Sequence, residues 1–387
     1  MLQYNFPTTI LLGQGSLDEF VNRLKIRGHR KALVVTDTTL LEIGIVGRLT
    51  GLLEKAGVAF DIFTDTHPNP IEEDVEKGVV AYKKGKCDHI IGIGGGSPID
   101  VAKVIKIMAA NPPPLAQYDD CLGGDGRITE PMPPLYAIPT TSGTGSEAGR
   151  SGVIIMRDTG KKTIFFHPDL MPAISILEPD LTAGLPPFLT AATGIDAFVH
   201  CLEAYFANMF HPMADGIALQ GMELIVRWLP TACTHGSDLE AREKMQIAAT
   251  MGAVAFQKGL GMIHSMAHPL SSRNGLHHGL ANALLVTESV LFLEQAALSF
   301  EQIAKIQKVR GIFEMNGFAR GSLSESCRDF IEATGIEPGL IRHGVKKSDL
   351  EVLADDAFVD PCHSGNMIPV TRDDLLMVLA ASLEPRK

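Results

Sequence analysis

The first half of the chain alternates short apolar runs with amphipathic stretches. Residues 9–12, 31–36, 58–63, 89–93 and 135–138 are apolar runs typical of buried strands. Between them, residues 17–24, 46–56, 71–85 and 101–110 carry hydrophobic side chains at helical spacing. Strands that alternate with helices predict a parallel, doubly wound sheet. We therefore expect an α/β domain over residues 1–185.

The pattern changes near residue 186, after which helical spacing continues almost without interruption. The predicted helices span residues 188–207, 212–229, 238–257, 261–272, 279–294, 297–315, 319–333, 347–355 and 372–382. Glycine and alanine are frequent in these segments, as expected where helices pack closely. We expect residues 186–387 to form a second, all-helical domain.

Composition narrows the class of protein. The chain has 387 residues, 45% of them hydrophobic and 20% charged, which is typical of a soluble enzyme with two domains. A net charge of −11 argues against nucleic-acid binding, which needs a basic face. We find no signal peptide and no apolar run long enough to span a membrane, so a cytoplasmic location is expected. The 6 cysteines form no C-x-x-C pair, which disfavours disulfides and cysteine-based zinc sites.

Histidines gather in one segment of the helical half. Residues 259–279 contain four of them, at positions 264, 268, 277 and 278. His264 and His268 are four residues apart and would share one face of a helix. Pro269 and Gly275 follow, and they suggest that the helix loosens into a loop carrying His277 and His278. Either of these two histidines could return a third imidazole from that loop.

Asp196 and His200 show the same four-residue spacing on another predicted helix. These two short segments contain 5 of the 13 histidines of the chain. A single histidine is more often a surface or satisfied core residue, but the joint pattern favours convergence on one divalent ion.

Two loops follow predicted strands and suit a phosphate-bearing ligand. Gly94–Gly96 lies at the carboxyl end of one strand with a helix start behind it, where backbone N–H groups can face a pyrophosphate. Pro139–Glu147 follows another strand and is rich in hydroxyl groups. Asp37 ends a third strand and could bind a ribose. The simpler alternatives are a tight turn, a surface loop and a helix cap, respectively.

Taken together, these motifs resemble the iron-containing (group III) alcohol dehydrogenases. The resemblance rests on Gly94-Gly-Gly-Ser-x-x-Asp100-x-x-Lys103, Thr140-Thr-Ser-Gly-Thr-Gly-Ser-Glu147, Asp196-Ala-x-x-His200-x-x-Glu203 and Gly261-x-x-His264-x-x-Ala-His268-Pro followed by His278-Gly. It covers essentially the whole chain. It implies a Rossmann-like parallel-sheet domain followed by an all-helical metal-binding domain, with NAD and a divalent metal as cofactors. The implied metal is Fe²⁺, with Zn²⁺ as an alternative.

The resemblance also implies roles for single residues. The metal ligands would be Asp196, His200, His264 and His278, and the non-ligand His268 would relay a proton. The cofactor-binding residues would be Gly94, Gly95, Gly96, Ser97, Asp100, Thr140, Thr141 and Thr144, with Asp37 and Lys162 at the ribose.

The expected activity is hydride transfer between a small primary alcohol and nicotinamide, in a homodimer or larger homo-oligomer. A first alternative is a short ω-hydroxy acid as substrate, because Arg150 and Arg273 depart from the family pattern and guanidinium groups bind carboxylates. A second alternative is a metal- and NAD-dependent lyase of the dehydroquinate synthase type. A third is a non-catalytic metal or nucleotide binder, which would leave the relay histidine unexplained.

Overall fold

The computed structural model describes residue 6 and residues 8–384, which divide into two compact units. The α/β unit consists of Phe6–Thr141 and Gly145–Thr182, and the helical unit contains Ala183 onward together with Ser142–Thr144. The division after residue 182 lies three residues before the boundary expected from the sequence. The fold class, a parallel-sheet domain followed by a helical domain, is confirmed.

Six parallel strands form the sheet of the α/β unit. They are β1 (Thr9–Leu12), β2 (Lys31–Val35), β3 (Ala59–Phe63), β4 (His89–Gly94), β5 (Leu135–Pro139) and β8 (Ile174–Leu177). Their spatial order is β1-β8-β5-β4-β2-β3, so the chain first builds outward from β2 to β3 and then returns to the other side of β2. The reversal places a topological switch point between β2 and β4, and ligands of such sheets bind at the carboxyl ends of these strands.

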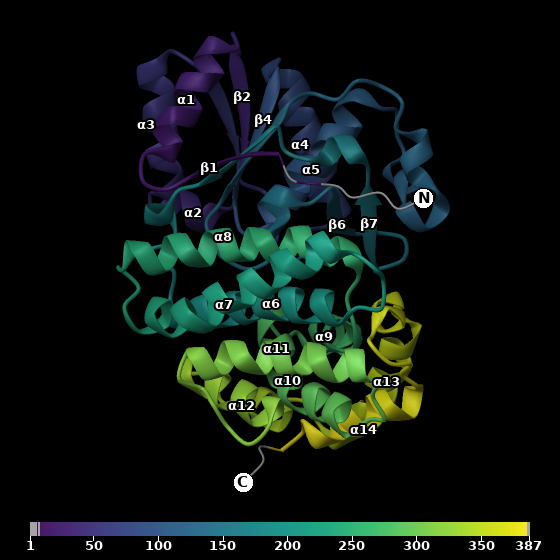
Figure 1. Ribbon diagram of the computed structural model, residues 1–387. Helices are drawn as coiled ribbons and strands as arrows, with labels where there is room; N and C mark the ends of the chain where they lie inside the picture. The colour runs from purple at the N-terminus through teal and green to yellow at the C-terminus, as the bar shows by residue number, and fades with distance from the viewer. Residues whose placement is uncertain (1–5, 7, 385–387) are drawn as a thin grey trace. The chain divides into compact units, whose positions relative to one another are not determined.

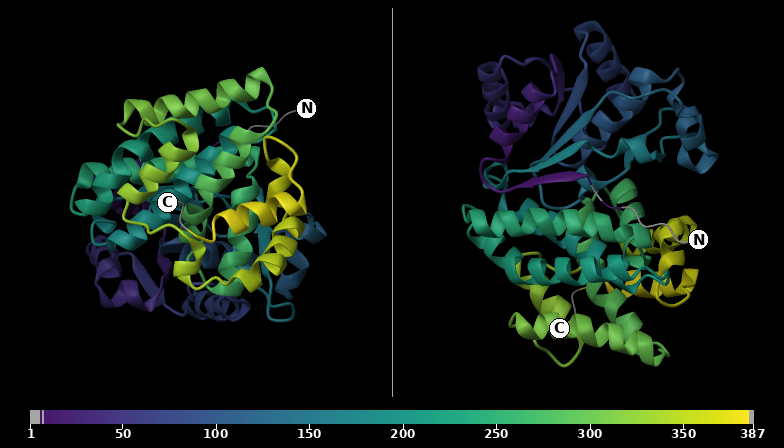
Figure 2. Two further views of the ribbon diagram at one scale, coloured as in Figure 1. Left: turned by 90° about the horizontal axis from the view of Figure 1, so that it is seen from below. Right: turned by 45° about the horizontal axis from the view of Figure 1, so that its top comes forward.

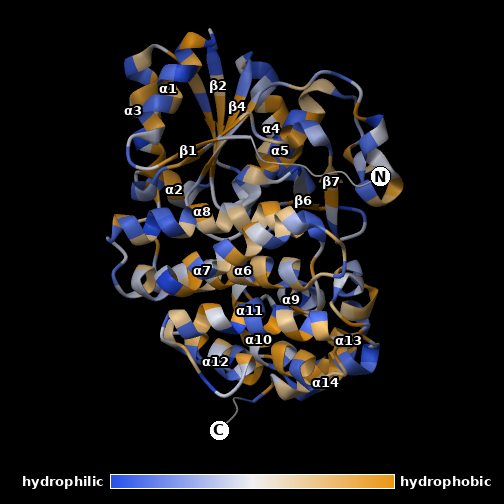
Figure 3. Cartoon of the chain, viewed as in Figure 1, coloured by the Kyte–Doolittle hydropathy of each residue, from blue (hydrophilic) through white to orange (hydrophobic). Residues whose placement is uncertain are grey.

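Helices cover both faces of this sheet (Figure 1). One apolar core joins α1 (Ser16–Ile26) and α3 (Ile45–Ala56) to strand residues such as Val34. A second core joins α4 (Glu72–Gly85) and α5 (Gly96–Ala110) to the neighbouring Leu33, which points to the opposite face. The inner strands β2, β4, β5 and β8 are buried on both faces and are mainly apolar, whereas the edge strands β1 and β3 are partly exposed (Figure 3).

Four elements were missed by the sequence pattern. They are the short helix α2 (Thr38–Glu42), the strand β8 and the antiparallel pair β6 (Ser151–Ile155) and β7 (Lys162–Phe166). Both strands of the pair contain short apolar runs, residues 153–155 and 164–166, but the strands are only half buried. In addition, α5 begins at Gly96, five residues before the expected start at 101, because Pro98 is accommodated in the first turn of a helix.

The helical unit is built around α6 (Pro187–Phe206). Every residue from Thr190 to Phe206 is buried, because other helices surround α6. The other α-helices in the described part of this unit are α7 (Pro212–Thr234), α8 (Leu239–Ala255), α9 (Met262–Asn274), α10 (His278–Gln295), α11 (Phe300–Met315), α12 (Leu323–Ala333), α13 (Leu350–Val359) and α14 (Arg372–Ala381). Each corresponds to a predicted helix. In Figure 2, α13 and α14 are the yellow segment beside the green helices, where α13 packs on α9 and α14 on α10. In the described part of the chain, no helix is long and apolar enough to cross a membrane.

The close approach of α10 to α6 gives a first prediction. A Cβ atom on Gly279 would lie 2.0 Å from the Ala192 carbonyl oxygen, which belongs to the backbone of α6. We expect Gly279→Ala to destabilise the helical unit by about 1–3 kcal/mol through overpacking, measured as a lower urea midpoint. The control is Gly311→Ala in α11, where a Cβ has open space, and we expect a gain of about 0.5–1 kcal/mol there. Equal midpoints for the two variants would contradict this packing argument.

Candidate active site

Three helices of the helical unit bring together the four residues that the sequence assigned to a metal. Asp196 and His200 lie one turn apart on α6, His264 lies in the first turn of α9, and His278 is the first residue of α10. Asp196, His200 and His264 form a group whose potential ligand atoms all lie within 4.8 Å of one another. The segments are distant in sequence, so helix packing creates the cluster.

The three imidazoles surround one oxygen of the Asp196 carboxylate. Asp196 Oδ1 lies 3.8 Å from Nε2 of His200, 3.8 Å from Nε2 of His264 and 3.6 Å from Nε2 of His278. Ligand atoms bound tetrahedrally at about 2.0–2.2 Å from a cation are separated by about 3.4 Å. The separations in the structure therefore fit a single divalent ion.

The electrostatics of the cluster suit a cation as well. Burial opposes ionisation of Asp196, but the nearby imidazoles and the Asn282 side-chain amide outweigh it and lower the pKa of the carboxyl. Burial lowers the pKa of His200 to about 4, despite the opposing charge of Asp196. Asn282 Nδ2 donates to Asp196 Oδ1 at 2.7 Å and lies 3.4 Å from His264 Nε2. Burial also lowers the pKa of His278, whereas for His264 burial is outweighed by the hydrogen bond to Glu203 and by nearby carboxylate charges, which raise its pKa. The carboxylate and the imidazole nitrogens together are a donor set for Fe²⁺ or Zn²⁺.

The expected loosening of α9 into a loop occurs at Gly275 and not at Pro269. The helix continues through Pro269 to Asn274 and ends at Gly275, whose φ of 69° is left-handed. The connection to α10 is therefore only three residues long, and His277 precedes the helix that His278 begins. Of the two histidines that the spacing left open, the structure brings His278 to Asp196.

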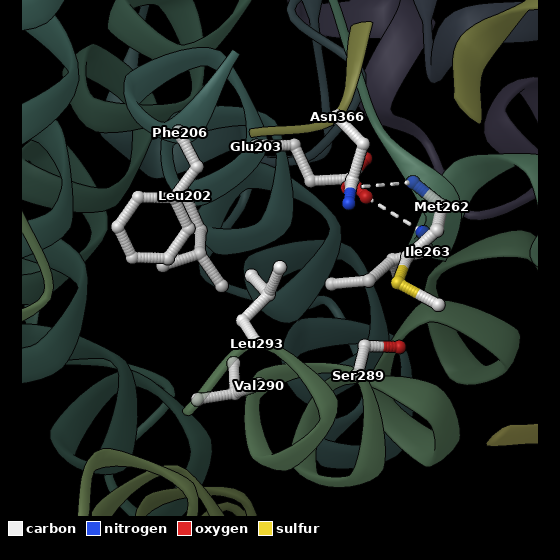
Figure 4. A pocket seen from close by; sticks show the side chains of 9 residues that line it. All are labelled: Leu202, Glu203, Phe206, Met262, Ile263, Ser289, Val290, Leu293 and Asn366. Atoms are coloured by element: carbon white, nitrogen blue, oxygen red, sulfur yellow. Dashed lines mark hydrogen bonds between the residues drawn. The ribbon is translucent and has the colours of Figure 1, made fainter. Parts of the chain in front are cut away.

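A second layer of residues, which the sequence analysis did not assign, supports the cluster. Glu203 accepts a hydrogen bond from His264 Nδ1 at 2.6 Å and another from the Ile263 backbone N–H at 2.6 Å. Figure 4 shows Glu203 beside Asn366, whose Oδ1 accepts from the Met262 N–H at 3.4 Å. A usable signal was present, because Glu203 is seven residues after Asp196 and therefore lies on the same face of α6.

His268 lies one turn after His264 and is held by Asp360. Its Nδ1 donates to Asp360 Oδ2 at 2.7 Å, and its ring stacks on that of His278 with centroids 5.3 Å apart. Burial opposes ionisation of Asp360, but the hydrogen bond from His268 and its charge lower the pKa of Asp360 to about 2. With 39% of its side chain exposed, His268 can exchange protons with solvent.

The predicted pyrophosphate loop lies at the switch point of the α/β unit. Gly94 ends β4 with a φ of 152°, and a Cβ there would lie 2.7 Å from the Pro98 ring. The Thr140 N–H donates to the Gly94 carbonyl at 2.9 Å, and a Cβ on Gly95 would touch Thr141 at 3.6 Å. Glycine is therefore needed at position 94, and the two predicted cofactor loops lie side by side.

Asp100 and Lys103 connect these loops from inside the unit. Asp100 accepts from Ser146 Oγ at 2.6 Å and from the Val153 N–H at 3.1 Å. Lys103 Nζ donates to the Ser146 and Ser151 carbonyls, and its burial lowers its pKa to about 8. The carboxylate of Asp100 is thus engaged with the protein, which points to a positioning role for this predicted cofactor residue.

The other predicted cofactor residues have separate locations. Asp37 caps α2 by accepting the Leu40 N–H at 2.9 Å through Oδ1. Ser97, in the first turn of α5, donates its hydroxyl to the Pro68 carbonyl at 2.7 Å. Lys162 begins β7 opposite Ile155, whereas Thr144 belongs to the helical unit.

The two arginines considered for substrate binding differ in their surroundings. Arg273 forms a bidentate, exposed ion pair with Asp356, which occupies its guanidinium group. Arg150 lies over the Phe166 ring at 5.1 Å, and burial lowers its pKa. Within the described residues, Arg150 forms no ion pair. Arg150 is therefore the better candidate for an anion.

Comparisons with known proteins agree with this geometry. The family model for iron-containing alcohol dehydrogenase matches residues 7–179, and that for the C-terminal part of the Fe-containing alcohol dehydrogenase family matches residues 190–383. A 4-hydroxybutyrate dehydrogenase of Cupriavidus necator is 37% identical, with 98% of this chain and 99% of that protein covered.

Solved structures give the same result. A 1,3-propanediol oxidoreductase superposes with a TM-score of 0.89 at 32% identity, covering 99% of this chain and all of the other. A sulfoacetaldehyde reductase from Bifidobacterium kashiwanohense, solved with NAD⁺, superposes with a TM-score of 0.86 at 27% identity over 99% of both chains. With both family models and full-length relatives matched, the chain belongs to the iron-containing alcohol dehydrogenase family and is an oxidoreductase of that family.

Proposed function

We propose that this chain is a metal-dependent, NAD(H)-linked alcohol dehydrogenase that interconverts a small alcohol and its aldehyde. The observation that carries the proposal is the convergence of three imidazole Nε2 atoms on one buried carboxylate oxygen. A lyase of the dehydroquinate synthase type has less support, because the matched family models are those of alcohol dehydrogenases.

Asp196, His200, His264 and His278 would hold the metal. When bound, a divalent cation supplies a Lewis acid that makes an alcohol hydroxyl more acidic, and NAD supplies the hydride acceptor. Among the imidazoles of the chain, burial lowers the pKa of His200 to about 4, so this ring is neutral near neutral pH. The negative charge of Asp196 is retained by the groups that surround it.

His268 is the proposed proton relay. Because the Asp360 carboxylate accepts the Nδ1 proton, Nε2 is left as the atom that takes up or releases a proton. Ser265 Oγ and the Cys362 N–H also donate to Asp360, which fixes the carboxylate and with it the imidazole plane. This is the arrangement of a base held by an orienting carboxylate.

The α/β unit would bind NAD at the carboxyl ends of β2 and β4. The N-terminus of α5 offers backbone N–H groups to a pyrophosphate, and Gly94–Gly96 leaves its approach open. Asp37 at the end of β2 would accept hydrogen bonds from a ribose and repel a 2′-phosphate, so NAD is the expected cofactor rather than NADP.

A short ω-hydroxy acid and its semialdehyde form a second candidate substrate pair. It is favoured by the 37% identity to a 4-hydroxybutyrate dehydrogenase and by the unpaired, partly buried guanidinium of Arg150. A guanidinium binds a carboxylate through two parallel hydrogen bonds.

The metal assignment predicts that His264→Ala and Asp196→Ala lose bound metal and nearly all kcat, because each removes one of four ligands. Metal per chain is measured by mass spectrometry after dialysis, and folding by circular dichroism. His235→Ala, which changes an exposed histidine at the end of α7, should keep both metal and activity. A metal-free Asp196→Ala protein with parental turnover would disprove the assignment.

The cofactor assignment predicts that Asp37→Asn increases the use of NADP. Asparagine keeps an oxygen that can cap α2 but removes the charge. We expect the ratio of kcat/KM for NADP to that for NAD to rise at least about tenfold, because like charges about 4 Å apart repel by roughly 1–4 kcal/mol. The thermal midpoint should stay unchanged, whereas Asp37→Ala should lower it. An unchanged cofactor ratio in Asp37→Asn would exclude contact with the ribose.

The substrate question is tested by comparing succinic semialdehyde with butanal in the presence of NADH. If the acid is the substrate, Arg150→Gln should raise its KM by about tenfold or more, since a hydrogen bond to a charged group contributes about 1.5–3 kcal/mol. The KM for butanal should not change. Arg273→Gln is the matched control and should leave both values unchanged, because its partner is Asp356. A higher kcat/KM for butanal in the parental enzyme would instead favour a neutral substrate.

A further inference from the structure

Glu203 is a buried carboxylate that contacts a proposed metal ligand and a helix end at the same time. Its side chain is 5% exposed, and it lies on α6 one turn after His200. Oε2 accepts from His264 Nδ1 at 2.6 Å and from the His264 backbone N–H at 3.4 Å, while Oε1 accepts from the Ile263 N–H at 2.6 Å. In Figure 4 this carboxylate points toward the first turn of α9.

We propose that Glu203 is a positioning residue that fixes the tautomer and ring orientation of His264 and thereby sets the affinity of the site for its divalent metal. This inference rests on the proposed metal site. It assigns a role to a residue that does not itself bind the metal.

The tautomer follows from the hydrogen bond. Because the carboxylate accepts at Nδ1, the proton of a neutral His264 is held on Nδ1, and Nε2 keeps the lone pair that a metal needs. The same Nε2 is the atom that lies 3.8 Å from Asp196 Oδ1. Asn282 Nδ2, a donor, lies 3.4 Å from this Nε2, which agrees with an acceptor there.

The position of the ring follows from the helix. The Ile263 and His264 N–H groups lie in the first turn of α9, where N–H groups have no partner within the helix. Glu203 binds them at the positive end of the helix dipole, which stabilises its charge without a cation. One carboxylate therefore ties the backbone that carries His264 to the imidazole itself.

Space for this contact is provided by Gly261. A Cβ at that position would lie 2.8 Å from Glu203 Oε1 and 2.8 Å from Asn366 Oδ1. Glycine thus allows both side chains to approach the helix end. The total charge is also balanced, because Asp196 and Glu203 together provide two buried negative charges for one divalent cation.

A simpler role for Glu203 would be to cap α9 without orienting His264. A variant of Asn366 can distinguish this role from the proposed one. Asn366 is equally buried near the same helix end and accepts the Met262 N–H, but no hydrogen bond joins it to His264. Removing Asn366 therefore tests the cost of uncapping α9. Replacing Glu203 tests uncapping together with the loss of the imidazole contact.

The experiment compares Glu203→Gln, Asn366→Ala and Asp196→Asn with the parental protein. The apo proteins are loaded with Zn²⁺ in competition with a chromophoric chelator, and their Co²⁺ forms are recorded by visible absorption. We expect Glu203→Gln to weaken metal binding by about 10- to 100-fold, as for other residues that orient a ligand, and to shift the Co²⁺ bands. Asn366→Ala should lower the thermal midpoint of the apo protein but keep parental affinity and parental bands.

The inference is overturned if Glu203→Gln binds Zn²⁺ with parental affinity and shows the parental Co²⁺ spectrum. It is also overturned if Asn366→Ala loses as much metal affinity as Glu203→Gln does. Nitrogen-15 NMR of the histidine-labelled, Zn²⁺-loaded parental protein tests it without a variant, should Glu203→Gln not fold. The proton of His264 must be on Nδ1, and a proton on Nε2 refutes the role. If instead the parental protein and Asp196→Asn bind metal alike, the proposed metal site itself fails.

Discussion

Burial of the Asp196 carboxylate constrains the whole helical unit. A charge that is 3% exposed loses most of its hydration, which costs several kcal/mol unless neighbouring groups compensate. Those groups come from three helices, since His200 lies on α6, His264 on α9, and His278 and Asn282 on α10. The helices must therefore pack so that these side chains meet around the carboxylate.

The α/β unit also buries a charged group, the ammonium of Lys103, and compensates it with hydrogen bonds. Lys103 is fully buried, and three oxygen acceptors from residues 146 and 151 bind its ammonium group. Asp100, one turn earlier on α5, binds Ser146 from the other side. Asp100 and Lys103 of the Gly94–Lys103 motif thus hold the hydroxyl-rich loop, residues 139–147, in place through Ser146. The N-terminus of the same helix, α5, faces the predicted pyrophosphate site.

The sequence predicted what depends on local spacing. Continuous apolar runs identified the strands of the sheet except β8, and four-residue spacing identified Asp196 with His200 and His264 with His268 as pairs on one helical face. It did not assign the partners of these residues, because Glu203 and His264 are 61 positions apart and His268 and Asp360 are 92 apart. Such contacts depend on how helices pack. The expected loosening at Pro269 did not occur for another reason. Pro269 cannot donate a backbone hydrogen bond, but packing against neighbouring helices keeps α9 helical at this residue.

The two proposed functional histidines of α9, His264 and His268, make the same kind of hydrogen bond but differ in exposure. Each donates Nδ1–H to a carboxylate from a distant segment, Glu203 for His264 and Asp360 for His268. Each therefore presents Nε2 as the reactive atom. What differs is exposure, because the side chain of His264 is 2% exposed and that of His268 is 39% exposed. A buried Nε2 beside a carboxylate favours a cation, whereas an accessible Nε2 can exchange protons with water. One helix would thus carry the proposed ligand and the proposed relay one turn apart, and the two histidines differ in their burial.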